Sequence, residues 1–444
     1  MRQHINKVLL GCLFVIFVFG VGCKKYLDAK PDKTLVVPST LDDLQAMLDF
    51  GPAVVADPGC DEVSADNYWL TTADYLSLPG EGDRRMYTWQ KDNIFQSYPN
   101  DWSALYNRIY YCNTVLAGVA AIERTTTNQV NYGNVKGQAL LLRGKSFLQG
   151  AIIWANAYDE ITAGTTLGIP LRLKPDFNEV TVRATLKQNF DQLLNDLMAS
   201  AVLLPVKPVH VRRPSKPAAY AYLSRAFLYM RKYAEAGKYA DSCLQLQNTL
   251  LDYNQLNQAA SYPVAKFNAE EILYSAMAPL QLVNGVAIVD STLYDSFDKD
   301  DLRKFIFFKS NGNGTYQFKG SYDGSFGGQF TGVAGDEVLL TRAECYARGG
   351  NTQLAMDDLN TLLIKRWKTG LFVRFTATNA ADALVLILKE RRKELIFRGT
   401  RCMDIKRLNQ EGAAITLKRM VNGETFLLPP NDLRYALPVP EAII

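Results

Sequence analysis

The sequence predicts a mainly α-helical protein in which paired helices form a scaffold. Three segments share the pattern Leu-x-Arg-small-x-x-aromatic, which places the Leu, the small residue and the aromatic residue near one helical face. Two other stretches, residues 54–97 and 251–335, lack helical periodicity and are rich in Gly, polar and aromatic residues. We therefore expect a helical body that carries long loop-rich insertions, and 444 residues suffice for a large core.

The N-terminus is typical of a secretory signal peptide. An uncharged run from Val8 to Cys23 follows Arg2 and Lys7. As a helix this run reaches only about 24 Å, short of the roughly 30 Å that a spanning helix must cross. A basic start, an apolar region and small residues before a break indicate cleavage, so we expect residues 1–22 to be removed.

Cys23 is the expected site of lipid attachment. The stretch Gly20-Val21-Gly22-Cys23 resembles a bacterial lipobox, although Gly20 stands where Leu is usual. The alternative is a chance cysteine beside an ordinary cleavage site. Loss of residues 1–22 lowers the formal net charge from +4 to +2, so nothing indicates a surface for nucleic acid.

The remaining cysteines and the single remaining histidine argue against several kinds of site. The cysteines are odd in number, widely scattered and without CxxC spacing, which disfavours a disulfide framework or a zinc site. His210 lies between prolines, which argues against Ser-His-Asp or Cys-His catalysis. We expect no cofactor and no catalytic or binding metal centre. The sequence does not decide whether a structural metal ion is bound. The cysteines are Cys60, Cys112, Cys243, Cys345 and Cys402.

The three repeated segments occupy residues 141–149, 223–231 and 340–348. Their small residue lets a neighbouring helix approach, the aromatic residue fills the space beside it, and the Arg can pair on the flank. After two copies, a turn and a second amphipathic helix follow, typical of a tetratricopeptide-like hairpin. The copies are 82 and 117 residues apart, so the pairs are irregular and carry insertions. The alternative is coincidence among generic amphipathic helices.

Further helices are expected at residues 102–116, 184–204 and 382–397. The first aligns aromatic and apolar residues on one side, and the second is periodic and stops at Pro205. The third is followed by Gly399, a natural C-terminal break.

Seven motifs in a fixed order extend over nearly the whole chain. The first four are CKKYLDAKPDK, WSALYNRIYYCN, ALLLRGKSFLQGAIIWANAY with GIPL, and TVRATLKQNFDQLLNDLMASAVLLP. The last three are DEVLLTRAECYARGGNTQLAMDDLNTLLIKR, LKERRKELIFRGTRCMDIKRLN and LPVPEAII. Together they resemble the SusD/RagB-like lipoproteins of Bacteroidetes outer membranes. Arg398, Cys402 and Met403 depart from the family pattern, as do the two lysines after Cys23.

The resemblance implies a glycan-binding or other nutrient-binding lipoprotein without catalytic activity. It would be anchored in the outer membrane through lipid on Cys23 and face the cell exterior, although Lys24 and Lys25 leave the face open. Its partner would be a TonB-dependent outer-membrane transporter (SusC-like), on which it would sit as a lid. Irregular tetratricopeptide-like helix pairs would form the scaffold, and loop-rich insertions would carry the binding face.

The expected organisation is a signal peptide, residues 1–22, and a single body, residues 23–444. Within the body, residues 23–250 hold the first helix pairs, 251–335 form a loop-rich insertion, and 336–444 hold the last pair and the tail. A loop-rich segment this long is uncommon unless it binds something or is disordered, and its regular aromatics argue against disorder.

Two loop stretches combine aromatic platforms with planar polar groups, the chemistry that sugars require. The alternative is that these aromatics pack the loops onto the scaffold, a role that we favour for Phe318 and Phe326. Asp66 and Asn67 have the further alternative of making turns. The candidate residues are Asp66, Asn67, Tyr68, Trp69 and Trp89 in the first stretch, and Tyr316 and Tyr322 in the second.

Three other functions stay open from the sequence. A peptide or other nutrient could replace the glycan, whose identity the sequence does not specify. A glycoside hydrolase needs two carboxylates about 5–10 Å apart, for which Asp61, Glu62 and Asp66, or Glu390 with Glu394, are candidates. A protein–protein adaptor would use the helix pairs alone.

Overall fold

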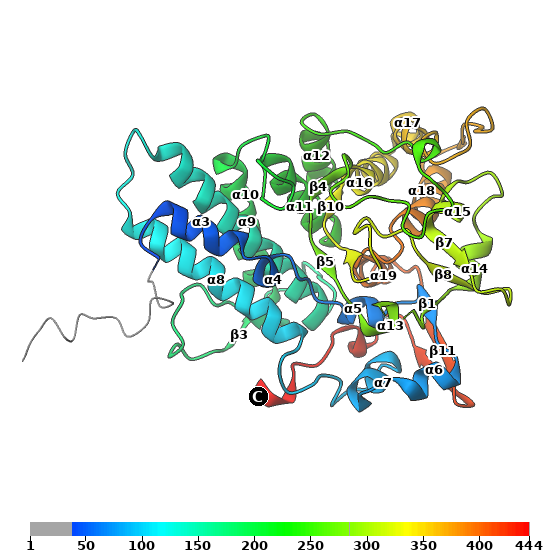
Figure 1. Cartoon of the computed structure of the whole chain (residues 1–444), viewed down its shortest axis with the longest axis horizontal. Coiled ribbons are helices and arrows are strands. Elements are labelled where there is room, and N and C mark those ends of the chain that lie inside the picture. Colours follow the sequence, from blue (N-terminus) through cyan, green and yellow to red (C-terminus); the bar gives the residue numbers. More distant parts are fainter. Residues whose placement is uncertain (1–37, 284, 444) are drawn as a thin grey trace, which may run out of the picture. The chain divides into compact units, whose positions relative to one another are not determined.

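The computed structural model describes residues 38–283 and 285–443, so Cys23 and the expected signal peptide lie outside it. Residues Thr40–Ile444 form one compact unit, which is mainly helical (Figure 1). Within the described ranges, no helix is both long and apolar enough to cross a membrane.

Eight long helices form the scaffold, and consecutive helices pack on one another from α8 to α12 and then onto α16 (Figure 1). The three helices expected at 102–116, 184–204 and 382–397 are confirmed with small shifts at their ends. Each begins at a cap whose side chain accepts a backbone N–H: Asn100, Thr185 and Asn379. The eight are α8 (Asp101–Ala121), α9 (Gln129–Trp154), α10 (Leu186–Leu203), α11 (Lys216–Tyr229), α12 (Tyr233–Leu244), α16 (Gly335–Arg348), α17 (Thr352–Leu363) and α18 (Ala380–Glu394).

The repeated segments lie in α9, α11 and α16, which pack against α10, α12 and α17 respectively. Their arginines link neighbouring helices. Arg143 reaches Asp196 of α10 at 2.7 Å, and Arg342 reaches Asp358 of α17 at 2.8 Å. A helix-pair scaffold is therefore confirmed, while its tetratricopeptide-like geometry stays a prediction.

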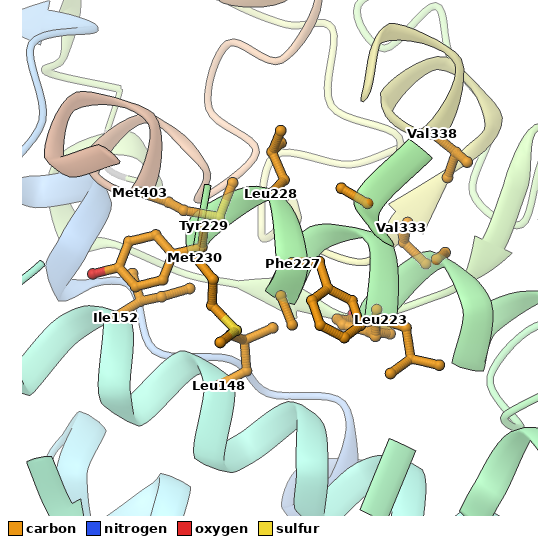
Figure 2. Close-up of a cluster of buried hydrophobic side chains, with 14 of the residues drawn as sticks. Leu148, Ile152, Leu223, Phe227, Leu228, Tyr229, Met230, Val333, Val338 and Met403 are labelled. Atoms are coloured by element: carbon orange, nitrogen blue, oxygen red, sulfur yellow. The ribbon is translucent and has the colours of Figure 1, made fainter. Parts of the chain in front are cut away.

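Apart from the partly buried Lys216 and Tyr220, every residue of helix α11 is buried, and the helix contributes to the largest core cluster. Figure 2 shows Leu223, Phe227, Leu228 and Tyr229 of α11, and Met230 at its end, among residues of α9, β10 (Val333–Ala334), α16 and α19 (Arg401–Asn409). The residues labelled there from the neighbouring elements are Leu148, Ile152, Val333, Val338 and Met403.

Short helices occupy the region from residue 54 to 97, which the sequence had indicated to be non-helical. They have four to seven residues each, too few to give a periodic pattern. The short helices of the unit are α3 (Leu41–Asp49), α4 (Gly51–Val54), α5 (Cys60–Val63), α6 (Thr72–Ser77), α7 (Glu81–Tyr87), α13 (Leu280–Val283), α14 (Ser291–Asp295) and α15 (Arg303–Phe307), with 3₁₀ turns at Tyr253–Gln255, Leu433–Tyr435 and Glu441–Ile443.

The strands form antiparallel pairs, several of which join segments far apart in the sequence. The pair β1–β6 connects the two loop-rich regions. The pairs are β1 (Tyr68–Trp69) with β6 (Ile288–Val289), β2 (Leu167–Pro170) with β3 (Arg183–Thr185), β4 (Glu271–Leu273) with β10 (Val333–Ala334), β5 (Ala276–Met277) with β9 (Gln329–Phe330), β7 (Phe308–Ser310) with β8 (Tyr316–Phe318), and β11 (Leu417–Val421) with β12 (Glu424–Leu428).

Candidate functional site

The two stretches proposed from the sequence to bind ligand meet in the fold. Trp69 on β1 lies opposite Ile288 on β6, and β6 in turn contacts β8, which begins at Tyr316. Trp69 and Tyr316 therefore lie on two strands that both contact β6, although 247 positions separate them in the chain.

Aromatic rings reach solvent on these strands. Trp69 is 36% exposed. Tyr316 is half-buried and stacks on Tyr294 of α14, with ring centroids 3.6 Å apart and planes inclined by 14°. The ammonium of Lys304 lies 4.7 Å from the centroid of Tyr294. We call Trp69, Tyr294 and Tyr316 the aromatic patch.

A half-exposed polar cluster borders β1. Asp66 accepts two hydrogen bonds from Arg401, at 2.6 and 2.9 Å, and lies 3.2 Å from Arg392. Arg392 is also 3.9 Å from Asp290, the N-cap of the short helix that carries Tyr294. Burial opposes ionisation of Asp66, but Arg401 and Arg392 prevail and lower its pKa to about 2. The cluster thus offers carboxylate and guanidinium groups beside the aromatic patch.

Three candidates of the first stretch are buried instead. Asn67 donates to Glu62 at 2.6 Å. Tyr68 is 3% exposed, and Trp89 donates its indole N–H to the carbonyl of Ser64 at 2.9 Å. These three side chains pack the loop onto the body and have almost no surface for a ligand.

The second stretch divides in the same way. Tyr322 is buried, with its hydroxyl 2.9 Å from that of Tyr253. Phe318 is half-buried against Phe397, as expected for a packing residue. Phe326 is 40% exposed, which contradicts the expectation that it belongs to the core.

Apart from Asp66, the carboxylates considered for hydrolysis are held in the interior. Burial raises the pKa of Glu62 to about 7 and raises that of Asp61 well above its usual value. Glu390 and Glu394 both bind the buried Arg303, at 2.5 and 3.0 Å. Glu390 and Glu394 therefore belong to an ion-pair network.

Glu270, Asp336 and Glu394 place carboxylate oxygens within 4.8 Å of one another. Their charges face guanidinium groups rather than an open coordination site. Arg366 binds Glu270 at 2.7 Å and Glu394 at 2.6 Å, and Arg398 binds Asp336 at 3.1 Å. This donor set fits a buried salt-bridge network better than a metal centre.

A cavity of about 850 Å³ lies away from the aromatic patch, between α8, the loop after β2 and the C-terminal tail. Sequence reasoning missed it because the aromatic residues on α8 were assigned to the scaffold. Its composition could have indicated a site, since the loop of residues 171–182 adds lysine, arginine and Phe177 opposite those rings.

Two family models match different parts of the chain. One is described as starch-binding and associating with the outer membrane and matches residues 25–228; the other is described as the SusD family and matches residues 336–433. No protein of curated function matches the chain significantly.

Several solved structures share the fold at low sequence identity. A SusD superfamily protein from Bacteroides thetaiotaomicron has a TM-score of 0.73 at 20% identity, over 91% of this chain and 97% of that one. A SusD-like carbohydrate-binding protein from Bacteroides vulgatus has 0.68 at 20%, over 91% and 96%. A laminarin-binding SusD-like protein has 0.61 at 18%, over 83% and 90%. At these identities the likeness establishes the fold alone.

Proposed function

Because the chain belongs to the SusD family, we propose that it binds a glycan at the outer membrane through the aromatic patch. The observation that carries the proposal is the exposure of Trp69 beside the stacked pair Tyr294–Tyr316, on strands supplied by distant loop regions. Large aromatic side chains are usually buried, so rings exposed together at the surface indicate a binding site.

The patch has the chemistry that a sugar ring requires. The flat rings offer apolar platforms for its C–H faces. The neighbouring Asp66, Asp290 and Arg392 offer acceptors and donors for its hydroxyl groups. Of the candidates named from the sequence, Asp66, Trp69 and Tyr316 are retained in this proposal, whereas Asn67, Tyr68, Trp89 and Tyr322 are buried and are not retained.

The wider proposal follows the family. The protein would deliver its glycan to a TonB-dependent outer-membrane transporter, remain attached to the outer membrane through lipid on Cys23, and catalyse no reaction. The internal ion pairing of Glu390 and Glu394 supports binding over hydrolysis. A peptide ligand is the second candidate, because aromatic rings and an Asp–Arg cluster also suit extended peptides.

Calorimetric titration of the protein without its signal peptide tests the proposal. Pools of neutral oligosaccharides, including laminarin fragments, are compared with a peptide pool of equal mass concentration. We expect heat with at least one glycan pool and none with peptides. Heat with peptides alone would show that the ligand is a peptide and not a glycan. No heat with any pool, together with co-purification of a membrane barrel, would favour an adaptor.

A further inference from the structure

The cavity of about 850 Å³ has an aromatic wall on α8. Trp102, Tyr106 and Tyr110 follow one another at four-residue spacing, which places them on one helical face at steps of about 6 Å. Phe177, which is 79% exposed, lies against Tyr110 with ring centroids 4.7 Å apart. The hydroxyl of Tyr106 donates to the carbonyl of Pro170 at 2.8 Å, so the wall is held to the opposite loop.

Backbone contacts fix the loop that forms the other wall. Arg172 donates to the carbonyl of Glu179 at 2.8 Å, and Arg183 donates to that of Gly168 at 2.7 Å. Asn113 donates from α8 to the carbonyl of Arg172 at 2.9 Å. The cavity is therefore built by hydrogen bonds and does not depend on a ligand for its shape.

The charge at the cavity is positive. Its lining includes four cationic side chains but only two carboxylates, Asp176 and Glu441. Both carboxylates already accept a backbone N–H, from Asn178 at 2.9 Å and Asn93 at 2.6 Å.

Two of the four cationic side chains are free to bind an anion. Lys91 and Lys174 are exposed, and within residues 38–283 and 285–443 their ammonium groups form no ion pair or hydrogen bond. Arg172 and Arg183, by contrast, use their guanidinium groups on backbone carbonyls, and Arg172 also lies 3.7 Å from the carboxylate of Glu179. An anionic group entering the cavity would meet two unpaired lysines above a row of aromatic rings.

We propose that this cavity is a second binding site, specific for acidic oligosaccharides that carry hexuronate carboxylates. The rings of Tyr106 and Tyr110 on α8 and of Phe177 would receive the apolar faces of the sugar rings, while Trp102 is buried behind them in the core. Lys91 and Lys174 would bind the carboxylates. The choice of sugar over other ring-shaped acids rests on the proposed function. The site shares no lining residue with the aromatic patch.

Matched ligands test the charge requirement. The signal-less protein is titrated with tetragalacturonate and with its fully methyl-esterified form, which keeps the rings and removes the charge. We expect the acid to bind at least about tenfold more tightly at low salt, and added salt to weaken it. Equal binding of both forms, or no binding of the acid, would overturn the proposal.

Matched variants test the location. Lys91→Gln with Lys174→Gln is expected to weaken tetragalacturonate binding about fivefold or more, and Phe177→Ala to weaken binding of the acid as well. Lys418→Gln, which neutralises an exposed lysine on β11, serves as the control and should have no effect. All these side chains are exposed, so thermal unfolding should be unchanged.

The same titrations separate this proposal from the proposed function. Trp69→Ala should leave tetragalacturonate binding intact, while the Lys91 and Lys174 double variant should leave neutral glycan binding intact. Loss of tetragalacturonate binding in Trp69→Ala would place the acid at the aromatic patch and overturn the second site. Unchanged binding of the acid in the double variant would overturn it as well.

Discussion

Asp66 joins two arginines that lie more than three hundred positions later in the sequence, Arg392 on α18 and Arg401 at the start of α19. The two arginines lower the pKa of this carboxyl group to about 2, so it is ionised at neutral pH and pairs with both. The residue therefore contributes to stability as well as to the polar edge of the aromatic patch.

Asp66→Asn is expected to lower the free energy of unfolding by about 2 kcal/mol at pH 7. The folded pKa lies below the ordinary value of 3.8, so the stabilisation is complete above that value and is lost as the pH falls toward 2. At pH 3 the difference between variant and wild type should shrink to about half. Urea denaturation at both pH values measures it, and an equal difference at pH 7 and pH 3 would contradict this assignment.

The adjacent residues Tyr68 and Trp69 show what the sequence could not specify at this scale. Successive side chains of a strand point to opposite faces, so one of the two had to be internal. Which one was internal depends on the pairing of β1 with β6, whose residues lie about 220 positions later. The sequence identified the aromatic stretch, but the pairing of β1 with β6 determines that Trp69 is the exposed residue of the two.

The helix pairs were the most predictable elements, because their Leu-x-Arg pattern encodes both a buried face and a flanking charge. Arg225 illustrates this. It pairs with Glu337 of α16 through two hydrogen bonds, at 2.7 and 2.6 Å, and thereby ties α11 to a helix more than a hundred positions away. The short helices between residues 54 and 97 carried no comparable pattern.

Arg225→Met is expected to lower the free energy of unfolding by about 3–5 kcal/mol, because it leaves Glu337 charged and unpaired in the interior. The double variant with Glu337→Met should lose less than the single variant, since no lone charge remains. Guanidinium denaturation of both proteins measures the difference. A double variant that is less stable than the single one would contradict the explanation.

The small residue of the first repeat permits close helix packing. A Cβ on Gly144 would lie 3.0 Å from the side chain of Leu197 and 3.1 Å from the carbonyl of Leu193 on α10. Gly144→Val should therefore lower the melting temperature, with a cost of about 1–3 kcal/mol. Gly164→Ala is the matched control, because nothing lies within 4 Å of its Cβ. Equal melting temperatures for both variants would contradict close packing at Gly144.

For the molecule as a whole, membrane attachment depends on a residue outside the described part of the chain. If Cys23 carries lipid, Cys23→Ser should move the protein from the membrane fraction to the soluble fraction of the cell. Cys243→Ala removes a buried thiol of α12 and should leave the protein in the membrane fraction. Fractionation followed by immunoblotting measures both, and membrane retention of Cys23→Ser would refute lipid anchoring at that residue.

The central claim is that the aromatic patch binds glycan, and it is tested most directly by titrating one neutral glycan ligand into three proteins. Trp69→Ala should weaken binding roughly tenfold or more, about 1.4 kcal/mol, without changing thermal unfolding. Tyr262→Ala removes an aromatic side chain of similar exposure, 40% against 36%, and should bind as the wild type does. Wild-type affinity in Trp69→Ala, or the same loss in both variants, would contradict the account.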